Sequence, residues 1–213
     1  MTRRILLAAF AAWLIALIPT AALRAQPAVA PDEFIRALST QIIDRIRADA
    51  DLRNGDLRKL SQFVDETVLP NVNFERMTAL AVGRNWRQAT PEQQKQLMTE
   101  FRALLTRTYA GALSSVKDQS VRVKPMRAGA DDTDVIVRSE IVQSRGEPIQ
   151  LDYRLEKAGS GWRIYDLNVV GVWLVETYRN QFSQEINAKG IDGLIKSLAD
   201  RNKQFQQSAA KAS

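Results

Sequence analysis

The stretch IQLDYRLE, residues 149–156, decides the fold of this chain. Its apolar and polar residues alternate along the whole stretch, which is the period of a β-strand with one buried face. The same alternation occurs over residues 135–141 and 162–170, and more briefly around Val121 and Val123. Short segments rich in Gly, Ser and Asp separate these runs, and short turns join antiparallel strands. The sequence therefore predicts a four-stranded antiparallel sheet with one apolar face and one polar face.

Helical periodicity occurs on both sides of the predicted sheet. The clearest start signal is Thr90-Pro91-Glu92-Gln93, a capping box with proline at the first helical position. Gly190 interrupts the last helical region and is a typical C-terminal cap. Apolar residues recur every three or four positions over residues 32–48, 56–68, 74–82, the segment that follows Thr90, 172–188 and 192–205.

These elements predict the fold class. The apolar face of a sheet must be covered, and helices that flank the sheet in sequence can cover it. We therefore expect an α+β fold in which N- and C-terminal helices cover one face of the sheet. One domain should span residues 26–205, and residues 206–213 are expected to be a disordered tail.

The N-terminus has the layout of a secretory signal peptide. Arg3 and Arg4 precede an uncharged apolar run over residues 5–18, which is too short for a typical membrane span. Small residues follow, and we place cleavage near Ala25, because the alternative cut after Ala30 is followed by Pro31. Loss of residues 1–25 removes three arginines and no acidic residue, so the net charge falls from +6 to about +3. The sequence leaves open whether the leader directs export by the general or by the twin-arginine route.

The composition excludes several classes of function. There is no Cys and no His, so neither a serine or cysteine triad nor a Cys/His zinc site can be built. The weak positive charge left after cleavage does not favour binding of nucleic acid. The carboxylates are scattered through amphipathic patterns, which indicates solvated surfaces rather than a catalytic pair. We therefore expect a protein that is not an enzyme and that uses no metal or cofactor.

Three stretches of the chain carry a family likeness. They are LPNVNF (69–74) with Met77 and LAVGRNWR (80–87); TPEQQ (90–94) leading into Phe101, Leu104, Leu105 and Tyr109; and YDL (165–167) through Gly171, with YRNQF (178–182) and GIDGLI (190–195). These stretches resemble the MlaC family, the periplasmic phospholipid-binding component of the maintenance-of-lipid-asymmetry system, also known as the toluene-tolerance auxiliary family. They occur in the family's order and span most of the chain after the leader. At one point the chain departs from the pattern, because Val172 and Trp173 follow Gly171 where the family usually has Ser.

The resemblance implies a cone related to the cystatin-like and nuclear-transport-factor-like folds, with a deep apolar cavity for the acyl chains of a phospholipid. It also implies a monomeric carrier in the periplasm. Its partners would be an outer-membrane lipoprotein-porin complex and an inner-membrane ABC transporter with its substrate-binding ring. Exchange of lipid between them would maintain the asymmetry of the outer membrane.

Candidate lipid-binding residues follow from the inward strand positions and the helix stripes. Indole suits the rim of such a cavity, because one end of the ring is apolar and the other polar, and arginine can attract a phosphate. Ordinary core packing is the competing interpretation for each lining residue. The lining candidates are Phe101, Leu105, Tyr109, Val135, Val137, Ile141, Leu151, Tyr153, Val169 and Val170, and the rim candidates are Trp86, Trp173, Arg84 and Arg87.

Two other functions remain open at this point. The cavity would equally suit another apolar ligand, such as a quinone, a hopanoid or a solvent molecule. Alternatively, the chain would be an adaptor of the cell envelope whose core is filled by its own side chains.

Overall fold

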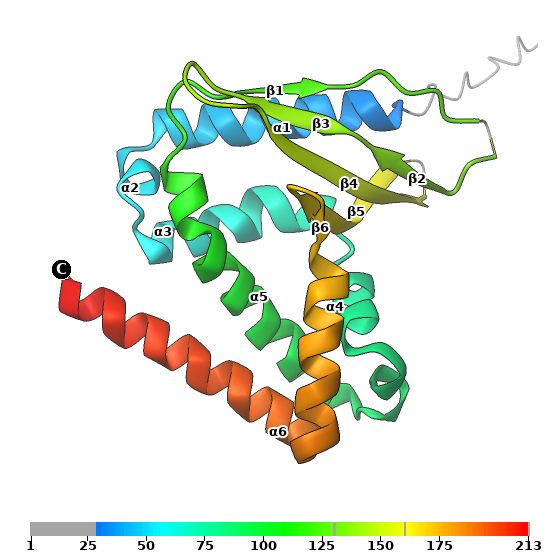
Figure 1. Ribbon diagram of the computed structural model, residues 1–213, viewed down its shortest axis with the longest axis vertical. Coiled ribbons are helices and arrows are strands. Elements are labelled where there is room, and N and C mark those ends of the chain that lie inside the picture. The colour runs from blue at the N-terminus through cyan, green and yellow to red at the C-terminus, as the bar shows by residue number, and fades with distance from the viewer. Residues whose placement is uncertain (1–28, 130, 160, 213) are drawn as a thin grey trace, which may run out of the picture.

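The computed structural model describes residues 29–129, 131–159 and 161–212, so the predicted signal peptide lies outside the described residues. Figure 1 shows the sheet and helix α1 (Pro31–Ala48) at one end of the molecule, with the other long helices extending away from them. The chain is thus an α+β protein, as the sequence predicts. Within the described ranges, no helix has both the length and the apolar composition that crossing a bilayer requires.

The helices before the sheet follow the predicted pattern closely. Thr90 and Gln93 form the expected capping box at the start of α5. The helix expected over residues 56–68 is α-helical only as far as Phe63 and then widens into a π-turn. Pro70 cannot donate the next helical hydrogen bond, so the segment ends in a short 3-10 turn. These elements are α2 (Ala50–Arg53), α3 (Leu57–Phe63), η1 (Val64–Val68), η2 (Leu69–Asn71), α4 (Phe74–Val82), η3 (Gly83–Gln88) and α5 (Pro91–Ser114).

The sheet is antiparallel and its strands follow one another in the order β1-β3-β4-β5-β6, with β2 also paired to β4. The meander is therefore confirmed, but the expected number of four strands is wrong, because the described residues form six. The strands are β1 (Ser120–Val123), β2 (Asp134–Val137), β3 (Ser139–Val142), β4 (Ile149–Ala158), β5 (Gly161–Val169) and β6 (Val172–Trp173).

A side chain explains one of the extra strands. The run predicted over residues 135–141 is divided at Arg138 into β2 and β3, which pair with β4 in one continuous register. At the division, the backbone N–H of Ser139 donates to Asp152 Oδ1 at 3.2 Å instead of to a backbone carbonyl. The other extra strand, β6, takes two residues that the helical pattern had assigned to the last helix.

The last helix, α6 (Leu174–Ala212), bends sharply at Gly190, whose φ of 74° is unfavourable for other residues. Figure 1 shows the two halves of α6 at a steep angle, so that the second half turns back beside α5. Gly193 permits this bend, since a Cβ there would lie 2.2 Å from the Cβ of Lys189 on the other side of Gly190. The helix continues to Ala212 instead of ending near Phe205, because residues 206–212 contain no Gly or Pro to stop it.

The buried apolar side chains form three clusters. The helical cluster joins α4, α5 and α6 around Phe101, whose ring lies 4.8 Å from that of Tyr178 and 5.2 Å from that of Phe182. The sheet cluster joins α1 to the apolar face of β2, β4 and β5 through Ile35 and Leu38. A third cluster around Leu60 joins α1, α2, α3 and α5. The helical and sheet clusters therefore have separate centres.

Candidate functional site

The apolar face of the sheet is closed at one end and open at the other. Residues directly opposite in antiparallel strands lie on the same face, so Leu151, Val169 and Val172 form one row across β4, β5 and β6. Val137 and Tyr153, in the next row, are 0% and 7% exposed beneath α1, whereas Val172 is 53% exposed. Cover by α1 thus ends partway along the face, and apolar side chains beyond it reach solvent.

Helix α5 supplies a second group of half-buried apolar side chains. Leu105 and Tyr109, one helical turn apart, pack against the helical cluster, as Val169 of the sheet does. Val72 and Leu167 pack against both the helical and the sheet clusters and so mark their junction. We name this half-buried set the apolar seam; it consists of Val72, Leu105, Tyr109, Leu151, Leu167 and Val169.

The seam carries no formal charge. Its one titratable side chain is Tyr109, and burial, followed by the proximity of Tyr178, raises the pKa of its phenol. The phenol therefore stays neutral at physiological pH. Mostly apolar linings with a few polar groups are typical of sites for small organic ligands. The seam has the chemistry to hold an apolar ligand, and it offers no group for acid–base or nucleophilic catalysis.

The predicted lining residues fall into three environments. Four candidates are at most 8% exposed and pack inside the core clusters; they are Phe101, Val135, Val137 and Tyr153. Leu105, Tyr109, Leu151 and Val169 lie in the seam, and Ile141 is half-buried opposite Ile149. Val170 is 66% exposed, because the pairing of Val169 with Val172 ends β5 one residue earlier than expected. The structure thus brings four of the ten candidates together in the seam, while the enclosed cavity itself stays a prediction.

The rim candidates on η3 lie away from the sheet. Arg84 and Arg87 are exposed, and Trp86 packs against the helical cluster. The carbonyl of Trp86 accepts a hydrogen bond from Gln94 near the start of α5. Leu105 is about 16 Å farther along that helix at a rise of 1.5 Å per residue. The structure therefore does not group these three residues with the open end of the sheet.

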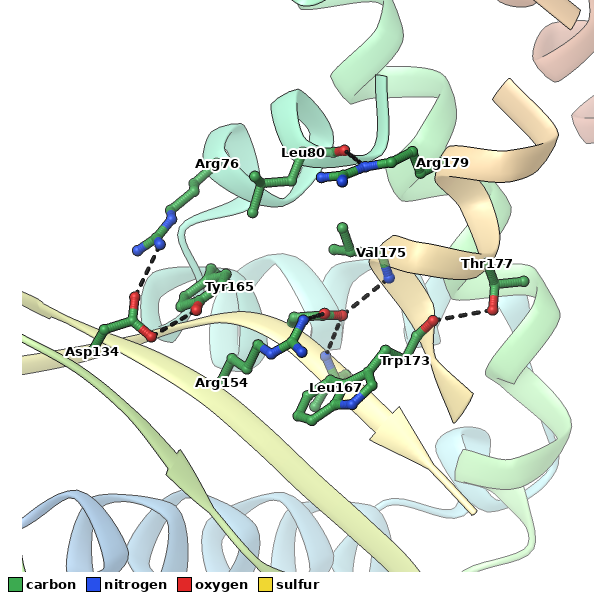
Figure 2. Close-up of polar contacts among 11 residues, drawn as sticks. Arg76, Leu80, Asp134, Arg154, Tyr165, Leu167, Trp173, Val175, Thr177 and Arg179 are labelled. Atoms are coloured by element: carbon green, nitrogen blue, oxygen red, sulfur yellow. Dashed lines mark hydrogen bonds and ion pairs between the residues drawn. The ribbon is translucent and has the colours of Figure 1, made fainter. Parts of the chain in front are cut away.

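Trp173 lies on the polar face of the sheet, because it is directly opposite Asn168. The guanidinium of Arg154 lies 3.9 Å from the centre of the Trp173 ring (Figure 2). It also lies 3.0 Å from the carboxylate of Asp166. The Asp166 side chain is fully buried and also accepts hydrogen bonds from the N–H groups of Val175 and Leu167. Burial nevertheless raises the pKa of this carboxyl group. This network fixes β6 and the start of α6 to β5.

A second polar network on the same face joins α4 to the sheet. Arg76 forms ion pairs with Glu156 and with Asp134, the latter at 2.9 Å, and its guanidinium lies 3.7 Å from the centre of the Tyr165 ring. The Tyr165 hydroxyl donates to Asp134 at 2.7 Å (Figure 2). Burial and this hydrogen bond raise the pKa of Tyr165 to about 12. Sequence reasoning missed both networks, because polar residues at alternate strand positions have the same pattern as a solvated face.

Two surface hollows lie elsewhere. One, of about 430 Å³, adjoins the junction of α1 and α2, and the other, of about 280 Å³, lies inside the bend of α6 near Glu185 and Arg201. Charged and polar side chains form much of both, and neither contains a predicted lining residue. Among the residues that the structure describes, no group of three or more acidic side chains could hold a metal ion.

Curated relatives share the sequence pattern over most of the chain. The chain is 25% identical over 168 residues to the intermembrane phospholipid transport system binding protein MlaC of Haemophilus influenzae, covering 78% of each protein. It is 22% identical over 163 residues to the toluene tolerance protein ttg2D of Pseudomonas putida, covering 76% of this chain and 75% of that one.

A solved structure supplies the fold comparison. It is that of a phospholipid-binding protein from Ralstonia solanacearum in complex with a phospholipid, and the two sequences are 47% identical. The two structures superimpose with a TM-score of 0.80, covering 84% of this chain and 99% of that one. The family model described as MlaC protein matches residues 36–200. The resemblance seen in the sequence is therefore confirmed, and the chain belongs to the MlaC family.

Proposed function

We propose that this protein binds phospholipid through its acyl chains and carries it across the periplasm. The observation that supports the proposal most directly is the uncharged, half-buried seam at the open end of the apolar face, where Leu151 and Val169 are opposed and Val172 continues the row into solvent. The bound phospholipid of the Ralstonia solanacearum relative supports the same assignment.

Lipid transfer through water has a high physical cost. Each methylene that leaves a membrane loses about 0.8 kcal/mol of apolar burial, so a chain of more than a dozen methylenes loses on the order of 10 kcal/mol. A carrier must replace this burial during transit. Side chains such as Leu105 and Val169, only half-buried by protein atoms, retain apolar surface that an acyl chain can cover. No catalytic step and no metal or cofactor is part of this proposal.

The remaining parts of the proposal concern location and partners. A signal peptide cleaved near Ala25 would release the chain into the periplasm as a monomer. The carrier would exchange lipid with an outer-membrane lipoprotein-porin complex and with an inner-membrane ABC transporter that includes a substrate-binding ring, so maintaining the asymmetry of the outer membrane. The curated relative named for intermembrane phospholipid transport supports this assignment.

The test begins with the ligand. Protein purified without detergent should contain phospholipid, identified by native mass spectrometry and by extraction. Val169→Trp should fill the seam and reduce the lipid content several-fold while the protein remains folded, because Val169 is only half-buried. Ile136→Trp is the matched control, since Ile136 is 42% exposed and lies opposite Arg154 on the polar face.

The same experiment distinguishes the alternatives. A quinone or hopanoid in the extract would identify a different apolar ligand. Absence of any lipid, together with failure to take up phospholipid from vesicles, would contradict the proposal. Val137→Trp is unsuitable for this purpose, because Val137 is completely buried and overpacking there should destabilise any version of the fold.

A further inference from the structure

The turn between β5 and β6 has a strained backbone. Val169 pairs with Val172, so Val170 and Gly171 form a two-residue hairpin loop. Both have positive φ, 52° at Val170 and 85° at Gly171. Such loops favour Asn-Gly or Asp-Gly, and a β-branched residue with positive φ is a genuine outlier. Val170 is the one non-glycine residue with positive φ in the described part of the chain.

Neighbouring groups hold this strained turn in place. The N–H of Val170 donates to the carbonyl of Gln150 at 3.0 Å, and the N–H of Gly171 donates to Asn168 Oδ1 at 2.8 Å. Asn168 is itself only 5% exposed. The surrounding structure thus determines the turn, which is the condition under which strain persists, and persistent strain is a reason to look for function.

The two valines at this turn are also unfavourably exposed. Val170 is 66% exposed and Val172 is 53% exposed, although polar residues would suit a surface turn better. Their position relates this exposure to the apolar seam. Val172 continues the row of Leu151 and Val169, so the turn extends the apolar seam to the surface of the molecule. We call Val170 and Val172 the apolar lip.

We propose that the apolar lip contacts the acyl chains of a phospholipid while they pass between a membrane and the seam. The lip thereby sets the rate of lipid transfer more than the amount of lipid held at equilibrium. Acyl chains are the occupant that the site favours, because the lip is continuous with the row assigned to them and its two side chains are uncharged. This inference rests on the proposed function.

The test separates rate from capacity. Protein loaded with a pyrene-labelled phosphatidylglycerol is mixed with unlabelled vesicles of phosphatidylethanolamine and phosphatidylglycerol, without any partner protein, and the rate of transfer is followed by fluorescence. The double variant Val170→Asn, Val172→Thr should lower the rate constant by about tenfold, through loss of apolar contact along the path. Its lipid content after purification should equal that of the wild type. Ile136→Thr, which replaces a 42% exposed apolar side chain on the polar face, should change neither quantity.

A stability measurement excludes a merely structural role. Val170→Asn alone should raise the midpoint of urea unfolding, because Asn adopts positive φ more easily than Val does. Slower transfer by a variant that is more stable than the wild type and holds the same amount of lipid would support the proposed role of the apolar lip. Equal transfer rates would overturn it, as would a loss of lipid content in parallel with the rate. A wild-type protein that holds no lipid would instead contradict the proposed function, and with it the proposed role of the apolar lip.

Discussion

The carboxylate of Asp166 accepts a hydrogen bond from the backbone N–H of Val175, 3.0 Å away, and so joins strand β5 to the first turn of α6. The same carboxylate pairs with Arg154, whose side chain is 34% exposed. A carboxylate at a helix N-terminus satisfies an otherwise unpaired N–H and interacts favourably with the helix dipole. One buried acidic side chain therefore helps to hold α6 against the sheet, beside the pairing of β6 with β5.

Replacement of Asp166 should lower the free energy of unfolding. Asp166→Leu leaves Arg154 and the Val175 N–H without their acceptor and should cost about 2–4 kcal/mol. Asp166→Asn keeps an acceptor for Val175 and should cost about 1 kcal/mol. Urea unfolding followed by circular dichroism measures both. Asp200→Asn is the control, because Asp200 pairs with Lys196 on the surface and its loss should have no measurable effect. Equal stabilities of Asp166→Leu and the wild type would refute this role for Asp166.

Tyr165 should make the protein sensitive to alkaline pH. Its pKa is raised from 10.0 to about 12 in the folded state, so the folded protein keeps a proton that the unfolded chain loses. Stability should therefore fall as pH rises from about 10 to about 12, the interval between the two pKa values. The Tyr165→Phe variant should not show this loss of stability between pH 10 and pH 12. Absorbance at 295 nm should show one tyrosine fewer ionising near pH 12 in Tyr165→Phe than in the wild type; a variant whose titration differs from that of the wild type only near pH 10 would disprove the assignment.

The bend of α6 should be intolerant of a methyl group at residue 193. Gly193→Ala would place its Cβ 2.2 Å from Lys189 Cβ. Because Lys189 Cβ is bonded directly to the backbone, no rotation of the lysine side chain can relieve this clash. We expect a loss of about 2 kcal/mol or more, in the range of overpacked sites. Gly111→Ala is the matched control, because Gly111 lies in α5 with nothing within 4 Å of the added Cβ. That variant should gain up to about 1 kcal/mol from helix propensity. Thermal melts compare the two variants, and similar effects of both would argue against a close approach at the bend.

The N-terminus of the mature protein should lie before Val29. Trp162 Nε1 donates to the Val29 carbonyl at 3.1 Å, and the N–H of Phe34 donates to the Ala30 carbonyl at 2.9 Å. Cleavage after Ala30 would remove both acceptors and put a charged amine at the positive end of α1. A chain that begins at Pro31 should thus be less stable than one that begins at Gln26 by about 1–3 kcal/mol.

Mass spectrometry of the exported protein gives the cleavage site directly. A mass that corresponds to cleavage near Ala25 is expected. An exported protein that begins at Pro31 and melts at the same temperature as the longer chain would show that these two hydrogen bonds contribute nothing to stability.

Much of the secondary structure was predictable, because it depends on local patterns. The alternation in IQLDYRLE predicts β4, and the residues around Thr90 predict the start of α5, since both signals lie within a few residues. The division of the run over residues 135–141 into β2 and β3 was not predictable. It depends on Asp152, a residue of another strand, which accepts the hydrogen bond of Ser139.

The candidate site was predictable only in part, for a related reason. Leu105, Tyr109, Leu151 and Val169 could be assigned to inward faces, but the same patterns also selected Phe101 and Val137, which the core buries completely. Periodicity specifies the face of a side chain, whereas its exposure depends on where a covering helix such as α1 ends.

The sequence by itself determined the apolar face of the sheet, the flanking helices and the likeness to the MlaC family, because each is encoded in residue order over short distances. Only the tertiary structure decided that α1 leaves one end of that face open, and that the Val170–Gly171 turn extends it to the surface. It alone also placed Trp173 over Arg154 on the opposite face. The physical reason is that strand register and helix packing bring distant residues together, and no local pattern specifies which polar and apolar groups then meet.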